Sequence, residues 1–109
     1  MTFVNNKSPK TLVLKILSQV PLGKVTTYGY IAGLCGITPI LVGWILGGMT
    51  DNEMTKYPWQ RVVAKGGIIS SLKLGPKGML QIEMLRKEGV EVVDECVVDI
   101  EKVMWVGVS

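Results

Sequence analysis

The chain has no histidine and only two cysteines among its 109 residues. A catalytic triad with a histidine base is therefore excluded. Two thiols are too few for a disulfide framework, and without histidine they cannot complete a zinc site. Cys35 and Cys96 thus favour a protein of a reducing compartment, and we expect a cytoplasmic location.

Charged side chains are also absent from Val25 to Thr50. A run this apolar raises the question of a membrane span, and its glycine pairs, at 29/33 and 43/47, have the spacing common in membrane helices. Gly36 and Pro39 interrupt the run, however, and such residues end one helix and begin another. The run therefore predicts two short helices joined by a turn, and we expect no membrane partner.

The charges that are present are unevenly spread. Residues 1–82 hold nine Lys/Arg and two acidic side chains, whereas residues 83–109 hold three Lys/Arg and seven acidic side chains. This separation is typical of a protein whose first part meets an anionic partner. An ordinary solvated surface remains the alternative.

Caps and breakers divide the chain into short helices. A hydroxyl residue or proline stands before most of these helices, and glycine or proline stands after them. These residues are Ser8-Pro9, Pro21-Leu22-Gly23, Thr27, Gly36, Thr38-Pro39 and Gly89. They predict helices over about 9–20, 28–35, 39–47 and 79–88. The second and third helices, joined by a glycine turn, form a helix-turn-helix candidate with the third helix in the recognition position.

The remaining segments complete the predicted fold. Residues 47–58 are predicted as a polar, acidic loop, and residues 73–78 as a basic loop. Between them, 61–64 and 68–71 predict a β-hairpin with its turn at Lys65-Gly66-Gly67, in the position of a wing. Short extended segments are expected over 90–93 and 97–100, and Trp105 is expected to pack on the core. The sequence therefore predicts one small α/β domain over residues 1–109, a winged helix-turn-helix that is mainly helical with a β-hairpin wing.

Several segments then stand in one order and spacing over roughly residues 12–105. They are Pro21-Leu22-Gly23-Lys24-Val25-Thr26-Thr27-Tyr28-Gly29-Tyr30-Ile31-Ala32, Val42-Gly43, Pro58-Trp59-Gln60-Arg61-Val62-Val63, Gly67 and Gln81-x-x-Met84-Leu85-x-x-Glu88-Gly89-Val90. Together they resemble the DNA-binding domain of the O(6)-alkylguanine-DNA alkyltransferases, although no single segment is specific. The resemblance implies a protein that binds alkylated double-stranded DNA in the minor groove.

One position separates the chain from the repair enzymes. Their motif reads Pro-Cys-His-Arg-Val, and the cysteine thiolate accepts the alkyl group. Here that position is Trp59, and an indole offers no comparable nucleophile. Trp59 resembles the alkyltransferase-like branch, whose members flip the damaged base without repairing it. Neither Cys35 nor Cys96 has a histidine base beside it, so we expect no enzymatic activity and no cofactor.

The resemblance assigns further roles, each with a simpler alternative. Trp59 lines the pocket for the flipped base, or is a core residue behind Pro58. Tyr28 pushes on the phosphate beside the target nucleotide, or is a half-buried helix residue. Thr27 donates to the DNA backbone, or only caps its helix. Gly43 allows close approach to the minor groove, or serves helix packing.

The basic residues of the motif and wing have roles of two kinds. Arg61 belongs to the binding motif, where its role is mainly structural. Lys65, Lys73 and Lys77 are candidates for phosphate contacts, and the alternative is a solvated surface.

Two departures weaken the resemblance at the DNA interface. Ile40 stands where the family has an intercalating arginine, and it can act only as an apolar wedge. Leu72 stands where some alkyltransferase-like proteins have an arginine over the flipped guanine, which leaves Lys73 for a cation–π contact. The predicted third helix is otherwise apolar and carries no cation.

The leading hypothesis is a non-enzymatic sensor that flips O(6)-alkylguanine and flags it for nucleotide-excision-repair proteins on the chromosome. The alternative is a DNA-binding or protein-interaction module that has lost lesion specificity. Self-association through the apolar third helix belongs to the same alternative.

Overall fold

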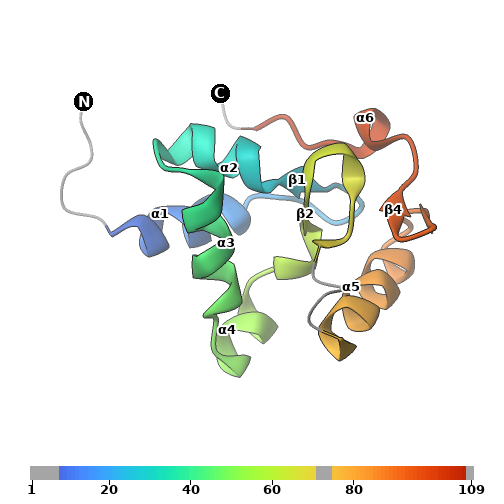
Figure 1. Ribbon diagram of the computed structural model, residues 1–109, viewed down its shortest axis with the longest axis horizontal. Coiled ribbons are helices and arrows are strands. Elements are labelled where there is room, and N and C mark those ends of the chain that lie inside the picture. Colours follow the sequence, from blue (N-terminus) through green and yellow to red (C-terminus); the bar gives the residue numbers. More distant parts are fainter. Residues whose placement is uncertain (1–7, 71–74, 108–109) are drawn as a thin grey trace.

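The computed structural model describes residues 8–70 and 75–107. Its α-helices are α1 (Pro9–Leu17), α2 (Tyr28–Cys35), α3 (Pro39–Gly47), α4 (Asp51–Lys56), α5 (Pro76–Lys87) and α6 (Ile100–Val103). Its strands are β1 (Thr26–Thr27), β2 (Val62–Val63), β3 (Val92–Val93) and β4 (Cys96–Val97), and its 3-10 helices are η1 (Trp59–Arg61) and η2 (Lys65–Gly67). Figure 1 shows α1, α2 and α3 at one end of the long axis and α5, β4 and α6 towards the other. The predicted class, a small mainly helical winged-helix fold, is confirmed.

Side-chain caps begin the first three helices where the sequence predicts them. The Oγ atoms of Ser8, Thr27 and Thr38 accept backbone N–H groups at 3.1, 3.1 and 3.2 Å. Gly36 ends α2 with a φ of 71°, a conformation that favours glycine. The first helix ends three residues earlier than predicted, at Leu17, although Val20 is still buried.

The uncharged run forms α2 and α3, which meet at 107°. Within the described ranges, no single helix is long and apolar enough to cross a membrane, and this bent pair alone reaches such length and hydropathy. Together with the turn between them, α2 and α3 form the helix-turn-helix that Gly36 and Pro39 predict.

The predicted acidic loop at 47–58 is wrong, because it contains α4. Thr50 and Glu53 form a capping box, in which the backbone N–H of each donates to the side chain of the other, at 2.9 and 3.1 Å. This reciprocal pairing satisfies two backbone donors and starts a helix despite the polar composition. The basic loop is also shorter than predicted, because α5 begins at Pro76 rather than Met79.

In the part of the predicted β-hairpin that the structure describes, residues 61–70, the two halves do not pair as strands. Val62 and Val63 pair in parallel with β1 instead, which buries both valines. The turn that follows is closed by the backbone N–H of Ala64, which donates to the carbonyl of Ile68 at 2.8 Å. Gly67 lies at φ 94°, and a Cβ there would stand 2.9 Å from the Val97 carbonyl oxygen.

The antiparallel pair of this fold lies later in the chain. Strand β3 pairs with β4, and Ile68 forms a bridge with Cys96 that ties the turn after β2 to this pair. The second extended segment is therefore 96–97 rather than 97–100, because Ile100 begins α6.

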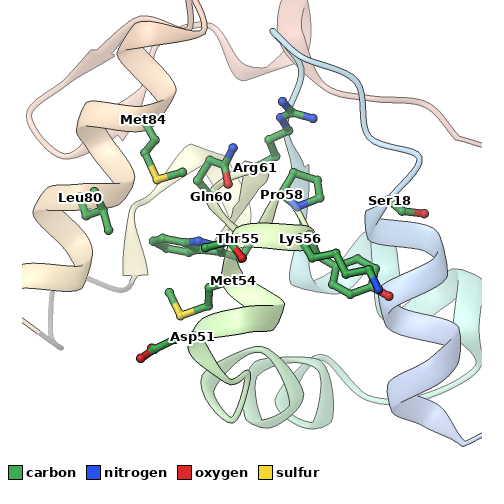
Figure 2. A pocket seen from close by; sticks show the side chains of 12 residues that line it. Ser18, Asp51, Met54, Thr55, Lys56, Pro58, Gln60, Arg61, Leu80 and Met84 are labelled. Atoms are coloured by element: carbon green, nitrogen blue, oxygen red, sulfur yellow. The ribbon is translucent and has the colours of Figure 1, made fainter.

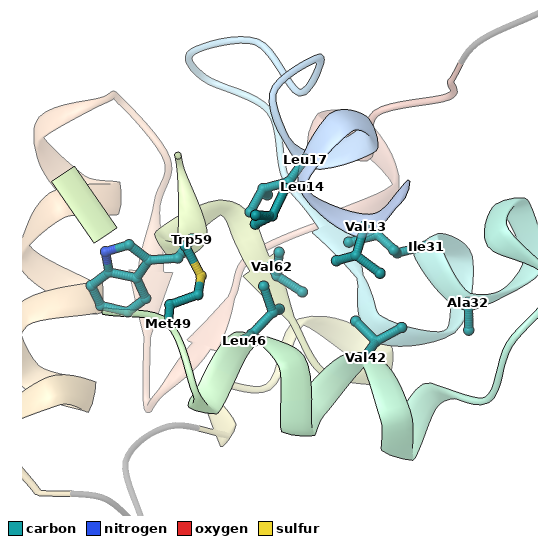
Figure 3. Packing of buried hydrophobic residues seen from close by; sticks show 10 residues of the cluster. All are labelled: Val13, Leu14, Leu17, Ile31, Ala32, Val42, Leu46, Met49, Trp59 and Val62. Carbon is teal, nitrogen blue, oxygen red and sulfur yellow. The ribbon is translucent and has the colours of Figure 1, made fainter. Parts of the chain in front are cut away.

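Two buried apolar clusters support the fold. The first joins α1, α2 and α3 to the segment after α4 and contains Trp59, Met49, Leu46, Val42 and other residues drawn in Figure 3. The second joins β2, α5, β3 and β4 to the residue before β1, through side chains that include Val25, Val63 and Leu85. Trp105 packs edge-on against Tyr30 with ring centroids 6.1 Å apart, as expected for a residue that returns to the body of the protein.

Candidate nucleic-acid interface

Trp59 lies in η1, between the two groups of helices. Its side chain is only 6% exposed, and it belongs to the first apolar cluster. The same residue lines a pocket of about 840 Å³. The two sequence-based interpretations of Trp59 are therefore compatible, because its ring is both part of the core and part of a cavity wall.

The pocket beside Trp59 is apolar on two sides. Met54 enters from α4, and Leu80 and Met84 enter from α5, as Figure 2 shows. Gln60, the next residue after Trp59, supplies a polar group to the lining. Its Oε1 atom is buried and has no hydrogen-bond partner among the described residues. Buried acceptors without a hydrogen-bond partner are uncommon in folded proteins.

A cation does lie over the Trp59 ring, but it comes from α5. The Lys77 ammonium stands 5.4 Å from the ring centroid, within the range of a cation–π interaction. Lys73 and Leu72, which the sequence singles out for contact with the flipped base, lie outside the described residues. Sequence reasoning named Lys77 only as a phosphate contact, since nothing in a linear motif shows that a helix begins at Pro76.

Arg61 has the structural role that the motif implies. Its guanidinium donates to both carboxylate oxygens of Glu88, at 2.9 and 3.1 Å, and to the carbonyl of Val20 at 2.7 Å. Gln60 Nε2 donates to the same carboxylate at 2.7 Å. Desolvation raises the pKa of Glu88, but the hydrogen bonds from Arg61 and Gln60 outweigh it, so the pKa lies below its ordinary value. These contacts hold η1, and with it Trp59, between the segment that follows α1 and the residue that ends α5.

Tyr28 and Thr27 stand at the start of α2. The Tyr28 ring is half-buried, and its hydroxyl accepts a hydrogen bond from Ser70 Oγ at 3.1 Å. Thr27 caps α2, because its Oγ1 accepts the N–H of Tyr30, and its own O–H group remains a possible donor. Lys65 is exposed in η2.

The recognition-position helix α3 presents an apolar outer face. Ile40 and Trp44 are 69% and 75% exposed. A Cβ on Gly43 would meet no atom within 4 Å, so this glycine is not required by packing inside the molecule. Its bare backbone is open to an approaching partner.

The two thiols lie away from the Trp59 motif in sequence. Cys35 packs against the first apolar cluster, and burial raises its pKa, which disfavours the nucleophilic thiolate. Cys96 Sγ donates to the Gly66 carbonyl at 3.3 Å.

The family model for the DNA-binding domain of 6-O-methylguanine DNA methyltransferase matches residues 9–90. The chain belongs to this family. It is 36% identical over 95 residues to a DNA base-flipping protein of Vibrio parahaemolyticus, a match that covers 85% of the chain and 91% of that relative. It is 31% identical over 101 residues to alkyltransferase-like protein 1 of Schizosaccharomyces pombe, covering 87% and 92%.

A solved structure of the S. pombe alkyltransferase-like protein Atl1, in complex with damaged DNA containing O6-carboxymethylguanine, has a similar fold. The TM-score is 0.82 at 30% identity, and the match covers 91% of the chain and 95% of that protein. The resemblance inferred from the sequence motifs is thereby confirmed at the level of family and fold.

Proposed function

We propose that this protein recognises O(6)-alkylguanine in double-stranded DNA and leaves the alkyl group in place. The chain binds in the minor groove as one DNA-binding domain over residues 1–109. The damaged base turns out of the stack into the pocket beside Trp59. The observation that carries this proposal is the buried ring of Trp59 in a pocket wall, at the motif position where the repair enzymes hold their cysteine.

The chemistry of the pocket supports this assignment. The Trp59 ring and the thioethers and methyl groups of Met54, Leu80 and Met84 offer apolar contact to an alkyl substituent. The buried Oε1 of Gln60 is an acceptor for an amino group of the purine. The pocket therefore combines the stacking, apolar contact and hydrogen bonding that a flipped base requires.

The DNA backbone is held outside the pocket. Tyr28 and Thr27 contact phosphate at the start of α2, Lys65 adds a salt-dependent contact, and Gly43 allows α3 to approach the groove. Arg61 acts indirectly, because its contacts to Glu88 and Val20 position Trp59. The bound and distorted duplex is the signal to nucleotide-excision-repair proteins.

The test is a titration of fluorescent duplexes that contain one O(6)-methylguanine or plain guanine, at two salt concentrations. We expect the wild-type protein to bind the lesion more tightly, and Trp59→Phe to reduce that preference while it keeps most of the core volume. Trp59→Ala should abolish the preference. Trp105→Phe is the matched control, because Trp105 packs on Tyr30 and does not line the pocket.

Two results would contradict the proposal. Equal, salt-sensitive affinity for both duplexes would replace it with a DNA-binding module that lacks lesion specificity. Transfer of a labelled alkyl group from the DNA to the protein would show that the protein is an enzyme.

A further inference from the structure

The hydroxyl oxygen of Tyr28 is held in place from two sides. The Tyr28 ring packs against the first apolar cluster, so packing sets the position of the ring. The backbone before it pairs in parallel with β2, with Thr26 opposite Val62 and Thr27 opposite Val63. The phenolic oxygen therefore has a defined place, and what remains free is the direction in which its proton points.

Ser70 restricts that direction. Its Oγ donates a hydrogen bond to the Tyr28 hydroxyl oxygen at 3.1 Å. A phenol oxygen carries one proton and accepts through its lone pairs, so a donor on one side leaves the proton to point to the other side. Within residues 8–70 and 75–107, the bond with Ser70 is the only hydrogen bond of the Tyr28 hydroxyl. The phenolic proton thus has no acceptor in this part of the chain.

The backbone that leads to Ser70 is anchored. Ile69 is only 2% exposed and belongs to the second apolar cluster, and its N–H donates to the Glu95 carbonyl at 3.0 Å. The carbonyl of Ile68 closes the preceding turn. The contact between Ser70 and Tyr28 therefore joins two segments that are each held independently of it.

The fold does not depend on this contact. The pairing of β1 with β2 already joins the start of α2 to the segment that leads to Ser70. Both Ser70 and Tyr28 are half-buried, and a hydrogen bond between two neutral hydroxyls there contributes little net stability, because each hydroxyl exchanges a bond with water for it. Orientation of a donor explains the pairing better than stabilisation of the fold does.

We propose that Ser70 is a positioning residue that turns the phenolic proton of Tyr28 towards a phosphate of the DNA. This inference rests on the proposed function, in which Tyr28 contacts the DNA backbone, and it adds the residue that directs the donor. In the series from the Ser70 hydroxyl through the Tyr28 hydroxyl to the phosphate, each hydrogen bond polarises the next. The contact with the anion is thereby strengthened.

The charge around the start of α2 suits a phosphate. From Ser8 to Thr50 the sequence holds three lysines and no acidic residue. The positive end of the α2 dipole lies at Tyr28, and the Thr27 side chain accepts only one N–H group of the first turn, that of Tyr30. An anion beside the Tyr28 hydroxyl is therefore stabilised by the local field as well as by the directed proton.

The test is a phosphate scan of the wild type, Tyr28→Phe and Ser70→Ala. Plain and O(6)-methylguanine duplexes carry one neutral methylphosphonate, placed in turn at each position near the target base. We expect one position to weaken wild-type binding by about 10-fold or more, as loss of a hydrogen bond to a charged group implies. The same position should have a much smaller effect on Tyr28→Phe. Its effect on Ser70→Ala should be about 3-fold, because the proton is no longer directed.

Three further variants serve as controls. Tyr30→Phe removes a second phenol of α2, whose oxygen accepts the Gly107 N–H at 2.8 Å, and it should leave the response to the scan unchanged. Ser70→Thr keeps the hydroxyl and should retain the wild-type response. Ser70→Cys has a similar size but a weak donor, and it should behave like Ser70→Ala. Ser70→Cys also decides the question if Ser70→Ala does not fold.

Two results would overturn the positioning role. One is the full wild-type response in both Ser70→Ala and Ser70→Cys. The other is a loss of affinity in these variants that is the same at every phosphate position, which would show that Ser70 only supports the fold.

These outcomes are separable from failure of the proposed function, because the scan on plain duplex does not involve lesion preference. A reduced response of Ser70→Ala at one phosphate, in a protein that binds both duplexes equally, leaves the positioning role standing without lesion recognition. Lesion preference that Trp59→Phe reduces, with an unchanged scan in Ser70→Ala and Ser70→Cys, gives the reverse.

Discussion

The segment from α1 to α3 and the segment from α5 to α6 place opposite kinds of side chain on their surfaces. The first carries lysines without acidic residues and exposes Ile40 and Trp44 on α3. The second carries most of the acidic side chains of the chain, and its Glu88 accepts hydrogen bonds from Arg61 and Gln60. The difference agrees with our proposal that the first segment faces the DNA, whereas Glu88 of the second segment anchors the residues around Trp59.

Arg61→Met is expected to have the largest effect, because it removes the contacts through which Arg61 joins the two segments. This change leaves the Glu88 carboxylate, which is mostly buried, without its cation, and it frees the Val20 carbonyl. We expect a loss of about 3 kcal/mol in the free energy of unfolding. Urea denaturation followed by circular dichroism measures it.

An exposed ion pair on α5 provides the control for that experiment. Lys87→Met removes the contact between Lys87 and Glu83, whose nitrogen and oxygen are 3.9 Å apart and exposed. No measurable change in the urea midpoint is expected. Equal effects of the two substitutions would show that the Arg61 contacts do not join the segments.

The same carboxylate makes stability depend on pH. Because the pKa of folded Glu88 lies below its ordinary value of 4.5, its contribution is present above about that pH. It is lost as the pH falls through the lower, folded pKa. We expect the stability gap between wild type and Glu88→Gln, measured by urea denaturation, to shrink as the pH falls below about 4.5. A gap that stays constant down to about pH 3 would contradict this assignment, and the exposed Glu83→Gln serves as the control.

The smallest expected effect on stability comes from a substitution in α3 that should change folding and DNA binding in opposite directions. Gly43→Ala should raise the free energy of unfolding by about 0.5–1 kcal/mol, because alanine is the better helix former and the site is open. The same change should weaken DNA binding, because a methyl group holds the groove away from the backbone. Thermal denaturation and duplex titration measure the two effects. Gly33→Ala on α2, also an open site, should stabilise the protein and leave affinity unchanged.

Local signals in the sequence predict much of the fold. Hydroxyl caps and Gly36 place α2 and α3 at the observed bounds. The caps accept backbone N–H groups in the first turn of each helix, and Gly36 ends α2 in the left-handed conformation, so both signals act within a few residues of themselves. The capping box of Thr50 and Glu53 was equally visible in the sequence and would have placed α4. The hairpin was mispredicted because Val62 and Val63 suit any strand, and their partner was decided by distant residues.

The motif order alone determined the family, and the replacement of the nucleophilic cysteine by Trp59 determined the expectation of binding without catalysis. Both depend on residue identity and spacing, which a sequence records in full. The tertiary structure decided which side chains meet: Lys77 over the Trp59 ring, Arg61 on Glu88, and Gln60 on the same carboxylate. It also showed that Trp44 faces outward. These pairings join residues that are far apart in the chain, and only the packing of α3 and α5 around η1 brings them together or keeps them apart.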